Sequence, residues 1–396
     1  MKRLLGISTF LIIMLTTACA PTFETEEEVV QDPEDEQQPE EDQRMIVSPD
    51  SLDTNDYRMV LPYQPSAARG TITNQVANRY DIDEFEQGLT RLAKNAFDPE
   101  EYLFQEGQYL GSSLVYSIID SLNPERPDDL QDELDEAVDE DNDDLIEEIE
   151  EEMEDYHEEN PRVFSHVLEQ NFLTREGDNR VELGGVAIGI ALKSEYNFSV
   201  NFGPTLNEQI EMDDMLEVGY DVSDAILQRI REIEELQDVP VLVALYREND
   251  RNAAVPGNFV AQSVVSPGDM LVSDWETVDE NNVLFPSSEA EDDYYEDSEM
   301  VAEFTADVSE YFPNYIGVIG RGFYQGDELR SMSINIPVEF NGSQEVVGFT
   351  QHVASLMVEH FPPYFDLEVT IESPSKQESV LFRRAGDEEV THHIYQ

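Results

Sequence analysis

The chain has 396 residues, which suffices for one large domain or for two to three ordinary domains with a packed core. Its 89 Asp and Glu outnumber its 22 Lys and Arg and give a formal net charge of −67 at pH 7, which excludes nucleic acid as a partner because like charges repel. Its single cysteine excludes an internal disulfide. A composition this acidic and lysine-poor indicates a salty or alkaline medium, in which counterions screen the self-repulsion.

Residues 1–18 have the parts of an export signal: a basic start, a short apolar run and small residues ending at Ala18. The apolar run is too short to serve as a permanent membrane-spanning helix. Cys19 follows directly, and a cysteine at the first mature position resembles the bacterial lipobox, in which the thiol is acylated. Thr16 stands where that motif commonly has leucine. We predict a lipoprotein signal peptide that is cleaved between Ala18 and Cys19.

An acylated Cys19 would anchor the mature chain to the outer face of the cytoplasmic membrane, because two or more acyl chains, palmitate among them, bind a bilayer firmly. The alternative is an ordinary signal peptide followed by an incidental cysteine, although free cysteines are rarely placed on exposed tethers. Residues 19–53 are rich in Glu, Asp, Gln and Pro. They cannot bury enough apolar surface to offset the cost of ordering, so we predict a disordered acidic tether that reaches on the order of 30 Å.

Residues 54–124 form the N-terminal part of the predicted fold. A short apolar run at residues 57–63 predicts a strand that a proline ends. Apolar residues at helical spacing predict one helix over residues 85–97 and another over residues 114–122. Asp98 followed by a proline predicts the start of a further helix between them.

Residues 125–160 are almost purely acidic, but apolar residues recur among them at roughly helical spacing. This pattern is typical of an exposed acidic helical hairpin and equally of a solvated insertion. The sequence leaves both interpretations open.

An order of predicted elements recurs in two later segments, residues 161–250 and residues 300–373. In the first, a helix over residues 164–172 precedes a long β-like run over residues 186–196. A further helix and a strand over residues 241–246 complete the unit.

The second unit repeats this order with a helix over residues 304–312, a hairpin of strands over residues 316–324 and 331–340, a further helix and a strand over residues 367–371. Chance similarity of short elements is the alternative explanation.

Glycines stand at matching joints of the two units, with Gly219 and Gly348 each expected just before the second helix. The shared order predicts an α+β fold of two related helix–hairpin–helix–strand repeats, placed after the tether and an α-rich N-terminal segment. Residues 374–396 are predicted to be a C-terminal tail outside the ectodomain of residues 54–373.

With these elements in place, the chain resembles the CamS family of bacterial lipoproteins, which are known as sex-pheromone precursors. Four stretches carry the resemblance, at residues 57–70, 78–89, 188–196 and 239–246. The first of them is the most specific, and the resemblance extends from about Tyr57 to Ser373. It implies a surface lipoprotein with an extracellular ectodomain and no established catalytic site.

In some members of that family the signal peptide is processed to a short apolar peptide that induces plasmid conjugation in a recipient cell. The resemblance therefore implies that the leader of this chain is a source of such a peptide. The two threonines of the matching segment are more polar than the family's peptide. The matching segment consists of Ile12, Ile13, Met14, Leu15, Thr16, Thr17 and Ala18.

The acidic segment contains a near match to a calcium-binding loop. Oxygen ligands fall at loop positions 1, 3, 5 and 12, which are Asp139, Asp141, Asp143 and Glu150. Asp144 replaces the glycine that permits the sharp turn at position 6. The alternative is that divalent cations bind weakly and diffusely to an acidic tract, with no discrete site and no cofactor.

Arg69 and Arg79 are candidate ligand-binding residues because positive charge is scarce in this chain. A guanidinium in a turn between small residues can orient an anionic or carbonyl-bearing ligand through two hydrogen bonds. The alternative is an internal salt bridge to one of the many carboxylates. The ligand itself is not evident from the sequence.

The six histidines do not form a zinc-binding pattern and are expected at the surface or as helix caps. No metalloprotease, phosphate-loop or nucleophile-elbow motif is present in the sequence. The leading hypothesis is therefore a non-enzymatic, lipid-anchored surface protein of the CamS type. One alternative is an extracellular solute-, glycan- or cation-binding lipoprotein, and a second is a cell-wall hydrolase that uses paired carboxylates.

Overall fold

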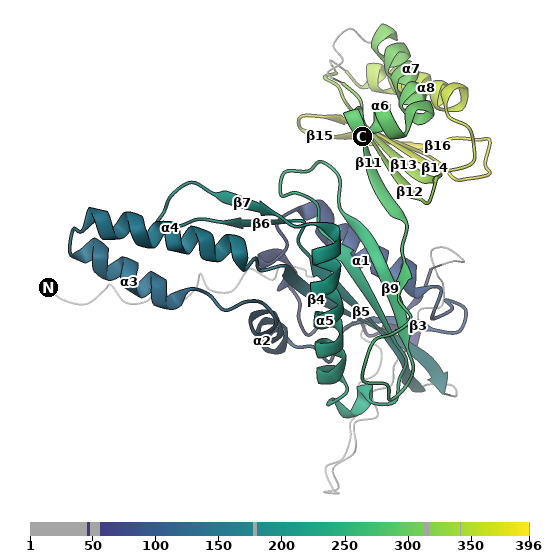
Figure 1. The fold of residues 1–396 in the computed structure, drawn as a ribbon. Coiled ribbons are helices and arrows are strands. Elements are labelled where there is room, and N and C mark those ends of the chain that lie inside the picture. Colours follow the sequence, from purple (N-terminus) through teal and green to yellow (C-terminus); the bar gives the residue numbers. More distant parts are fainter. Residues whose placement is uncertain (1–45, 48–55, 177–179, 312–316, 341, 396) are drawn as a thin grey trace, which may run out of the picture. The chain divides into compact units, whose positions relative to one another are not determined.

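The computed structural model describes residues 46–47, 56–176, 180–311, 317–340 and 342–395. The predicted signal peptide, Cys19 and most of the predicted tether lie outside these ranges. The described part of the chain is a mixed α+β fold built around two large β-sheets (Figure 1). None of its described helices combines the length and apolarity needed to span a bilayer.

The first sheet has eight strands in the order β1-β2-β3-β4-β5-β8-β9-β10. The pairs β2–β3 and β5–β8 are parallel, and the other neighbours are antiparallel. The strands are β1 (Ile46–Val47), β2 (Arg58–Leu61), β3 (Leu103–Glu106), β4 (Phe164–Glu176), β5 (Arg180–Leu192), β8 (Val241–Arg247), β9 (Asn258–Val265) and β10 (Glu276–Thr277).

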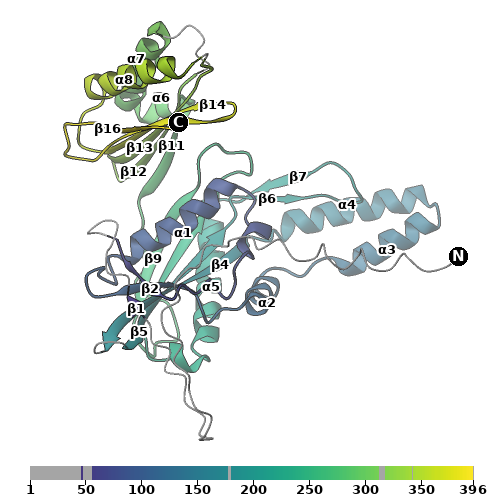
Figure 2. The ribbon, with the colours of Figure 1, turned by 180° about the vertical axis from the view of Figure 1, so that it is seen from behind.

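Helices cover both faces of this sheet, with α1 (Arg79–Ala93) on one face and α2 (Ser112–Leu122) and α5 (Met212–Ile230) on the other (Figures 1 and 2). Strand β5 shows why: its even-numbered residues from 186 to 192 join the core beneath α5, whereas Ala187 and Ala191 join the core beneath α1. The successive side chains of a strand point to opposite faces, so a strand that is buried on both faces is apolar throughout.

Two glycines of β5 allow the α1 side to pack closely against the sheet. A Cβ on Gly189 would lie 2.8 Å from the ring of Phe85, and one on Gly185 would lie 2.1 Å from the ring of Phe97. Both rings are almost fully buried. The glycines therefore provide the space that these aromatic side chains fill.

The acidic segment forms two helices, α3 (Asp128–Asp139) and α4 (Asp143–Glu159), which pack against each other. Their apolar stripes, among them Leu134, Ile149 and Met153, are buried in the core shared with α2 and α5. The helical-hairpin interpretation of this segment is thus confirmed. A small two-stranded sheet of β6 (Glu195–Phe198) and β7 (Leu206–Gln209) adds aromatic residues to the same core.

The second large sheet has six strands in the order β11-β12-β13-β14-β15-β16, and its helices contribute to a single core. Two short 3₁₀ helices complete the fold. The elements are β11 (Glu280–Phe285), α6 (Ser288–Asp293), α7 (Tyr295–Tyr311), β12 (Ile319–Gln325), β13 (Glu328–Pro337), α8 (Ser343–His360), β14 (Asp366–Ser373), β15 (Lys376–Arg383) and β16 (Thr391–Ile394), with η1 (Ile72–Asn74) and η2 (Glu234–Leu236).

The segment predicted as a helix over residues 164–172 is strand β4, so that prediction is wrong. Phe164 and Val167 belong to the core beneath α5, and Phe172 belongs to the core beneath α1. A register shift lies between Phe164 and His166 and breaks the simple two-residue alternation. Apolar residues on both faces, together with this shift, imitate the spacing of a helix.

The helix predicted to begin at Asp98 is also absent, and a single turn leads instead into β3. The Asp98 carboxylate accepts a hydrogen bond from the backbone N–H of Glu100 at 2.9 Å, which satisfies the turn locally. The predicted tail after residue 373 is a further correction, because β15 pairs with β14 and β16 pairs with β15. The predicted tether also needs a correction, because β1 lies within residues 19–53 and pairs with β2.

The predicted repeat is not confirmed in its stated form, because the first unit lacks the opening helix. The matching glycines lie inside their helices rather than before them, Gly219 in α5 and Gly348 in α8. A Cβ on Gly219 would lie 2.7 Å from Leu192, so this glycine serves close packing of α5 on the sheet.

Candidate functional site

The sequence-predicted site residues divide into those within and those outside the described structure. Cys19 and the segment of residues 12–18 lie outside it. Arg79 begins α1 with its side chain exposed, whereas Arg69 lies at a cleft that does not include Arg79. The structure therefore does not join the two arginines in one site.

The predicted calcium loop is not formed. Asp139 ends α3 and Asp143 already begins α4, so the second half of the supposed loop is helical. The helix directs Glu150 away from the turn, and its carboxylate accepts a hydrogen bond from Asn201. Within the described residues, no group of three or more His, Cys, Asp or Glu side chains is placed to hold a metal ion.

Arg69 lies at the mouth of a cleft of about 400 Å³, which we call the Arg69 cleft. The cleft is lined by the turn after β2, by α1, by β3 and by β4. Arg69 is exposed, and among the described residues its guanidinium forms no hydrogen bond or ion pair. The internal salt bridge, which was the alternative to ligand binding for Arg69, is thus not formed within the described part of the chain.

A buried histidine lines the same cleft. His166 on β4 is 2% exposed, and its Nδ1 atom has no hydrogen-bond partner among the described residues. Burial lowers the pKa of His166 to about 4, so the imidazole is neutral at neutral pH. The expectation that the histidines lie at the surface is wrong for His166, because β4 is covered on both faces.

Carboxylates hold the walls of the Arg69 cleft. Glu169 on β4 is buried and accepts hydrogen bonds from the backbone N–H groups of Gln108, Tyr109 and Leu110 at 3.0, 3.0 and 2.6 Å. Burial raises the pKa of Glu169, and these three donors oppose the rise. Its carboxylate therefore fixes the loop that follows β3.

Two further carboxylates, those of Glu106 and Glu86, line the same cleft. Glu106 accepts hydrogen bonds from the Tyr63 hydroxyl and from the backbone N–H of Ser66, both at 2.6 Å. Burial, and after it the nearby charge of Glu106, raises the pKa of Glu86 on α1. The cleft thus presents a guanidinium, two neighbouring carboxylates and a neutral imidazole, which can bind a small polar solute.

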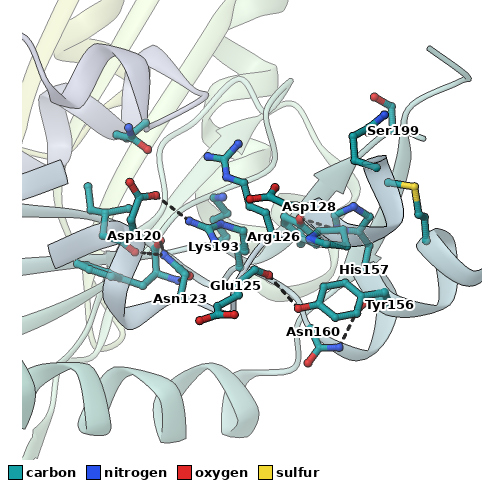
Figure 3. A pocket seen from close by; sticks show the side chains of 18 of the residues that line it. Asp120, Asn123, Glu125, Arg126, Asp128, Tyr156, His157, Asn160, Lys193 and Ser199 are labelled. Atoms are coloured by element: carbon teal, nitrogen blue, oxygen red, sulfur yellow. Dashed lines mark hydrogen bonds and ion pairs between the residues drawn. The ribbon is translucent and has the colours of Figure 1, made fainter. Parts of the chain in front are cut away.

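A larger cavity of about 550 Å³ lies where α2, α3 and α4 meet the first sheet, and we call it the basic cavity (Figure 3). Arg126, Arg162 and Lys193 all line it. In Figure 3, Lys193 and Arg126 lie between Asp120 on one side and His157 and Tyr156 on the other.

Sequence reasoning missed the basic cavity. Its cations come from three separated segments: the loop before α3, the loop before β4 and the loop between β5 and β6. The only signal in the sequence is the scarcity of lysine and arginine, which makes each of them notable. Their convergence depends on the helical hairpin folding back onto the sheet.

The fold and these sites define a class of protein: an α+β domain with helix-covered sheets and polar clefts. The model of the family described as "CamS sex pheromone cAM373 precursor" matches residues 63–389, and the chain belongs to this family. No curated protein matches the chain.

Two solved structures share the fold. One is the crystal structure of a sex pheromone precursor from Lactobacillus salivarius subsp. salivarius UCC118, with 22% identity, a TM-score of 0.76 and coverage of 89% of this chain and 99% of that one. The other is the C-terminal domain of the sex pheromone staph-cAM373 precursor from Staphylococcus aureus, with 24% identity, a TM-score of 0.64 and coverage of 81% and 98%.

Proposed function

We propose that this CamS-family chain is a lipid-anchored surface protein whose ectodomain binds an extracellular solute without catalysis. The acylated group is Cys19, which holds the ectodomain at the outer face of the cytoplasmic membrane. The leader, residues 1–18, supplies the signalling peptide, as the names of the related precursors suggest. The support for anchoring is the position of Cys19 directly after a short apolar leader.

A Cys19→Ser variant tests the anchoring. Wild-type protein is expected in the membrane fraction with a lipid mass on Cys19, because two or more acyl chains hold a protein firmly at a bilayer. The variant is expected in the culture medium without that mass, and mass spectrometry of both fractions distinguishes the two. Thr22→Ala, a neighbouring change that keeps the cysteine, serves as the control and stays with the membrane. Wild-type Cys19 without lipid would refute the anchor, and a medium without a peptide ending at Ala18 would refute the peptide source.

The observation that supports solute binding is the Arg69 cleft, where the Arg69 guanidinium and the buried Nδ1 of His166, both without a hydrogen-bond partner among the described residues, line the same space. Leaving a buried polar atom without a hydrogen bond costs about 1–3 kcal/mol, which a bound ligand can recover. A guanidinium favours a planar carboxylate, which accepts two parallel hydrogen bonds. We therefore propose a small carboxylate-bearing solute as the ligand class.

Thermal unfolding across a panel of peptides, glycans and divalent cations tests this binding. A carboxylate-bearing member is expected to raise the melting temperature of the wild-type chain, and Arg69→Ala is expected to weaken its binding by roughly tenfold. Arg79→Ala removes an exposed arginine outside the cleft and is the matched control, which should respond as the wild type does. A flat response to the whole panel would contradict solute binding.

The neighbouring carboxylates support a second candidate function, a hydrolase of cell-wall glycans. Glu86 lies near Glu106 and has a raised pKa. In such a pair one carboxyl can donate a proton while the other stays ionised. Glycan turnover by the purified chain that is lost in Glu86→Gln would favour this function. The absence of turnover would leave the binding function in place.

A further inference from the structure

We propose that the basic cavity is a second binding site, specific for a phosphate group carried by a small polyol or sugar. It shares no lining residue with the Arg69 cleft. This inference is independent of the solute proposed for that cleft, and it does not depend on the lipid anchor.

The first observation is that three cations meet in this cavity, although the chain carries a formal charge of −67 and three carboxylates, Asp120, Glu125 and Asp128, line the cavity as well. Burial lowers the pKa of Lys193, and the positive charges of Arg162 and Arg126 lower it further, while Glu248 opposes the shift. The three cations are thus close enough to repel one another. Such repulsion is unfavourable unless an anion compensates it.

The second observation is that two of these cations form no hydrogen bond or ion pair within the described part of the chain, although Glu248 attracts Lys193 from a distance. Among the described residues, neither the Lys193 ammonium nor the Arg126 guanidinium forms a hydrogen bond or an ion pair. Arg162 differs, because its Nη2 lies 3.1 Å from the Asp120 carboxylate and its Nη1 donates to the Pro124 carbonyl. Lys193 is half-buried and Arg126 is exposed, so both keep donors that a ligand in the cavity can reach.

Two polar side chains in the walls of the cavity are held in place by hydrogen bonds within the protein. The Asn123 side chain donates to the carbonyls of Ile119 and Phe164 and accepts from the Phe164 N–H, so it has a structural role. The Tyr156 hydroxyl donates to the Glu125 carbonyl at 2.9 Å. These contacts give Asn123 and Tyr156 structural roles, so neither is expected to donate to a ligand.

An aromatic wall adjoins the cations. Lys193 lies over the ring of Tyr196 at 5.5 Å, and the Tyr196 hydroxyl is 3.1 Å from Nδ1 of His157. His157 in turn stacks on Phe198 at 4.9 Å, and burial lowers its pKa, so it is neutral at neutral pH. Rings beside a charged pocket offer a surface for the carbon skeleton of a polyol or sugar.

The number and type of donors favour phosphate over carboxylate. Arginine presents a planar fork that matches two phosphate oxygens, and lysine adds a point charge to a third. A phosphate monoester carries close to two negative charges at neutral pH, which suits two unpaired cations better than the single charge of a carboxylate. The exposed Glu125 and Asp128 on the cavity lining disfavour long polyanions.

Calorimetric titration of the full chain, purified in mild detergent, tests this site. The probes are inorganic phosphate, glycerol phosphate and a glycerol phosphodiester, with sulfate, malonate and glycerol as comparison solutes. Ionic strength is held constant with chloride, because any salt stabilises so acidic a chain by screening. We expect glycerol phosphate, which combines two negative charges with a polyol, to bind at least tenfold more tightly than sulfate or malonate. Binding of the monoester alone indicates a free small phosphate, and binding of the diester indicates the end of a polymer.

Lys193→Gln and Arg126→Gln are expected to weaken phosphate binding at least tenfold each. Lys193→Gln is also expected to leave the melting temperature of the ligand-free chain unchanged or raised, because it removes a half-buried charge that two nearby arginines repel, so lost binding cannot be assigned to unfolding. Arg330→Gln, an exposed arginine on β13 paired with Glu328, makes the same charge change elsewhere and should bind as the wild type does. Arg69→Ala should also bind phosphate normally. Equal binding of sulfate and glycerol phosphate, or full binding by the Lys193→Gln, Arg126→Gln double variant, would overturn the proposal.

Discussion

Replacing Asp81 with alanine is expected to lower the free energy of unfolding by about 3 kcal/mol, because it leaves several buried donors without an acceptor. Asp81 on α1 is fully buried and accepts from the Tyr246 hydroxyl at 2.8 Å and from the Gly257 N–H at 2.6 Å. The Asn249 N–H contacts both carboxylate oxygens at 3.3 Å. This one side chain thus joins α1 to β8 and to the loop before β9.

The same carboxyl predicts a dependence of stability on pH. Burial raises the pKa of Asp81 to about 6 from its usual 3.8, and its hydrogen bonds only partly offset the rise. The folded state therefore holds this proton more tightly than the unfolded state. The stability from Asp81 is fully present below about pH 3.8 and is lost as the pH rises through about 6, an effect of roughly 3 kcal/mol.

Urea denaturation between pH 3.5 and 8 measures both effects. Asp81→Asn keeps an acceptor but does not titrate, so it should flatten the decline of stability between about pH 4 and 6. Glu248, whose pKa burial raises to about 7, should still contribute a decline in that variant. Asp83→Asn changes an exposed carboxylate on the same helix and should keep the wild-type profile. A wild-type stability that rises between pH 4 and 6 relative to Asp81→Asn would contradict the assignment.

Replacing Arg231 with methionine is expected to lower the free energy of unfolding by about 4 kcal/mol, because hydrogen bonds from a charged donor are worth about 1.5–3 kcal/mol each and are not additive. Arg231 follows α5 and is 5% exposed. Its guanidinium donates to four backbone carbonyls of two loops. The carbonyls belong to Leu236, Val239 at 2.7 Å, Ser266 at 3.0 Å and Asp269 at 3.1 Å.

Arg231→Lys distinguishes the geometry of the donors from the charge alone. Lysine keeps the charge but has a single nitrogen, so it should recover only part of the lost stability. Arg229→Met, two residues earlier and in the last turn of α5, removes an arginine that donates no side-chain hydrogen bond among the described residues, and it should cost less than about 1 kcal/mol. Equal unfolding midpoints for Arg231→Met and the wild type would show that the buried cation is replaceable by apolar packing.

Most of the elements could be predicted where one face of an element is buried and the other is solvated. The apolar stripe of α2 and its end at Asn123 follow directly from the order of residues, as does strand β14, whose buried and exposed residues alternate. Strand β4 could not be predicted, because both of its faces are buried and a register shift disturbs the alternation. Strands β15 and β16 could not be predicted, because they are placed by long-range pairing, β15 with β14 and β16 with β15.

The candidate sites divide in the same way. Arg69 was recognisable from the sequence because its turn and its scarce charge are local features. His166 was not, because its burial depends on helices that cover both faces of β4. The prediction of a calcium-binding loop is wrong because helix α4 begins at Asp143, where the loop requires an open turn.

Features that depend on composition and on neighbouring residues are evident without a structure: the position of Cys19 directly after a short apolar run, the extreme negative charge and the family to which the chain belongs. Only the tertiary structure decided which charges meet. Arg126, Arg162 and Lys193 are separated along the chain, and they converge because the apolar stripes of α3 and α4 must be buried against the sheet. Burial of apolar surface drives that packing, and the unpaired cations of the basic cavity are its consequence.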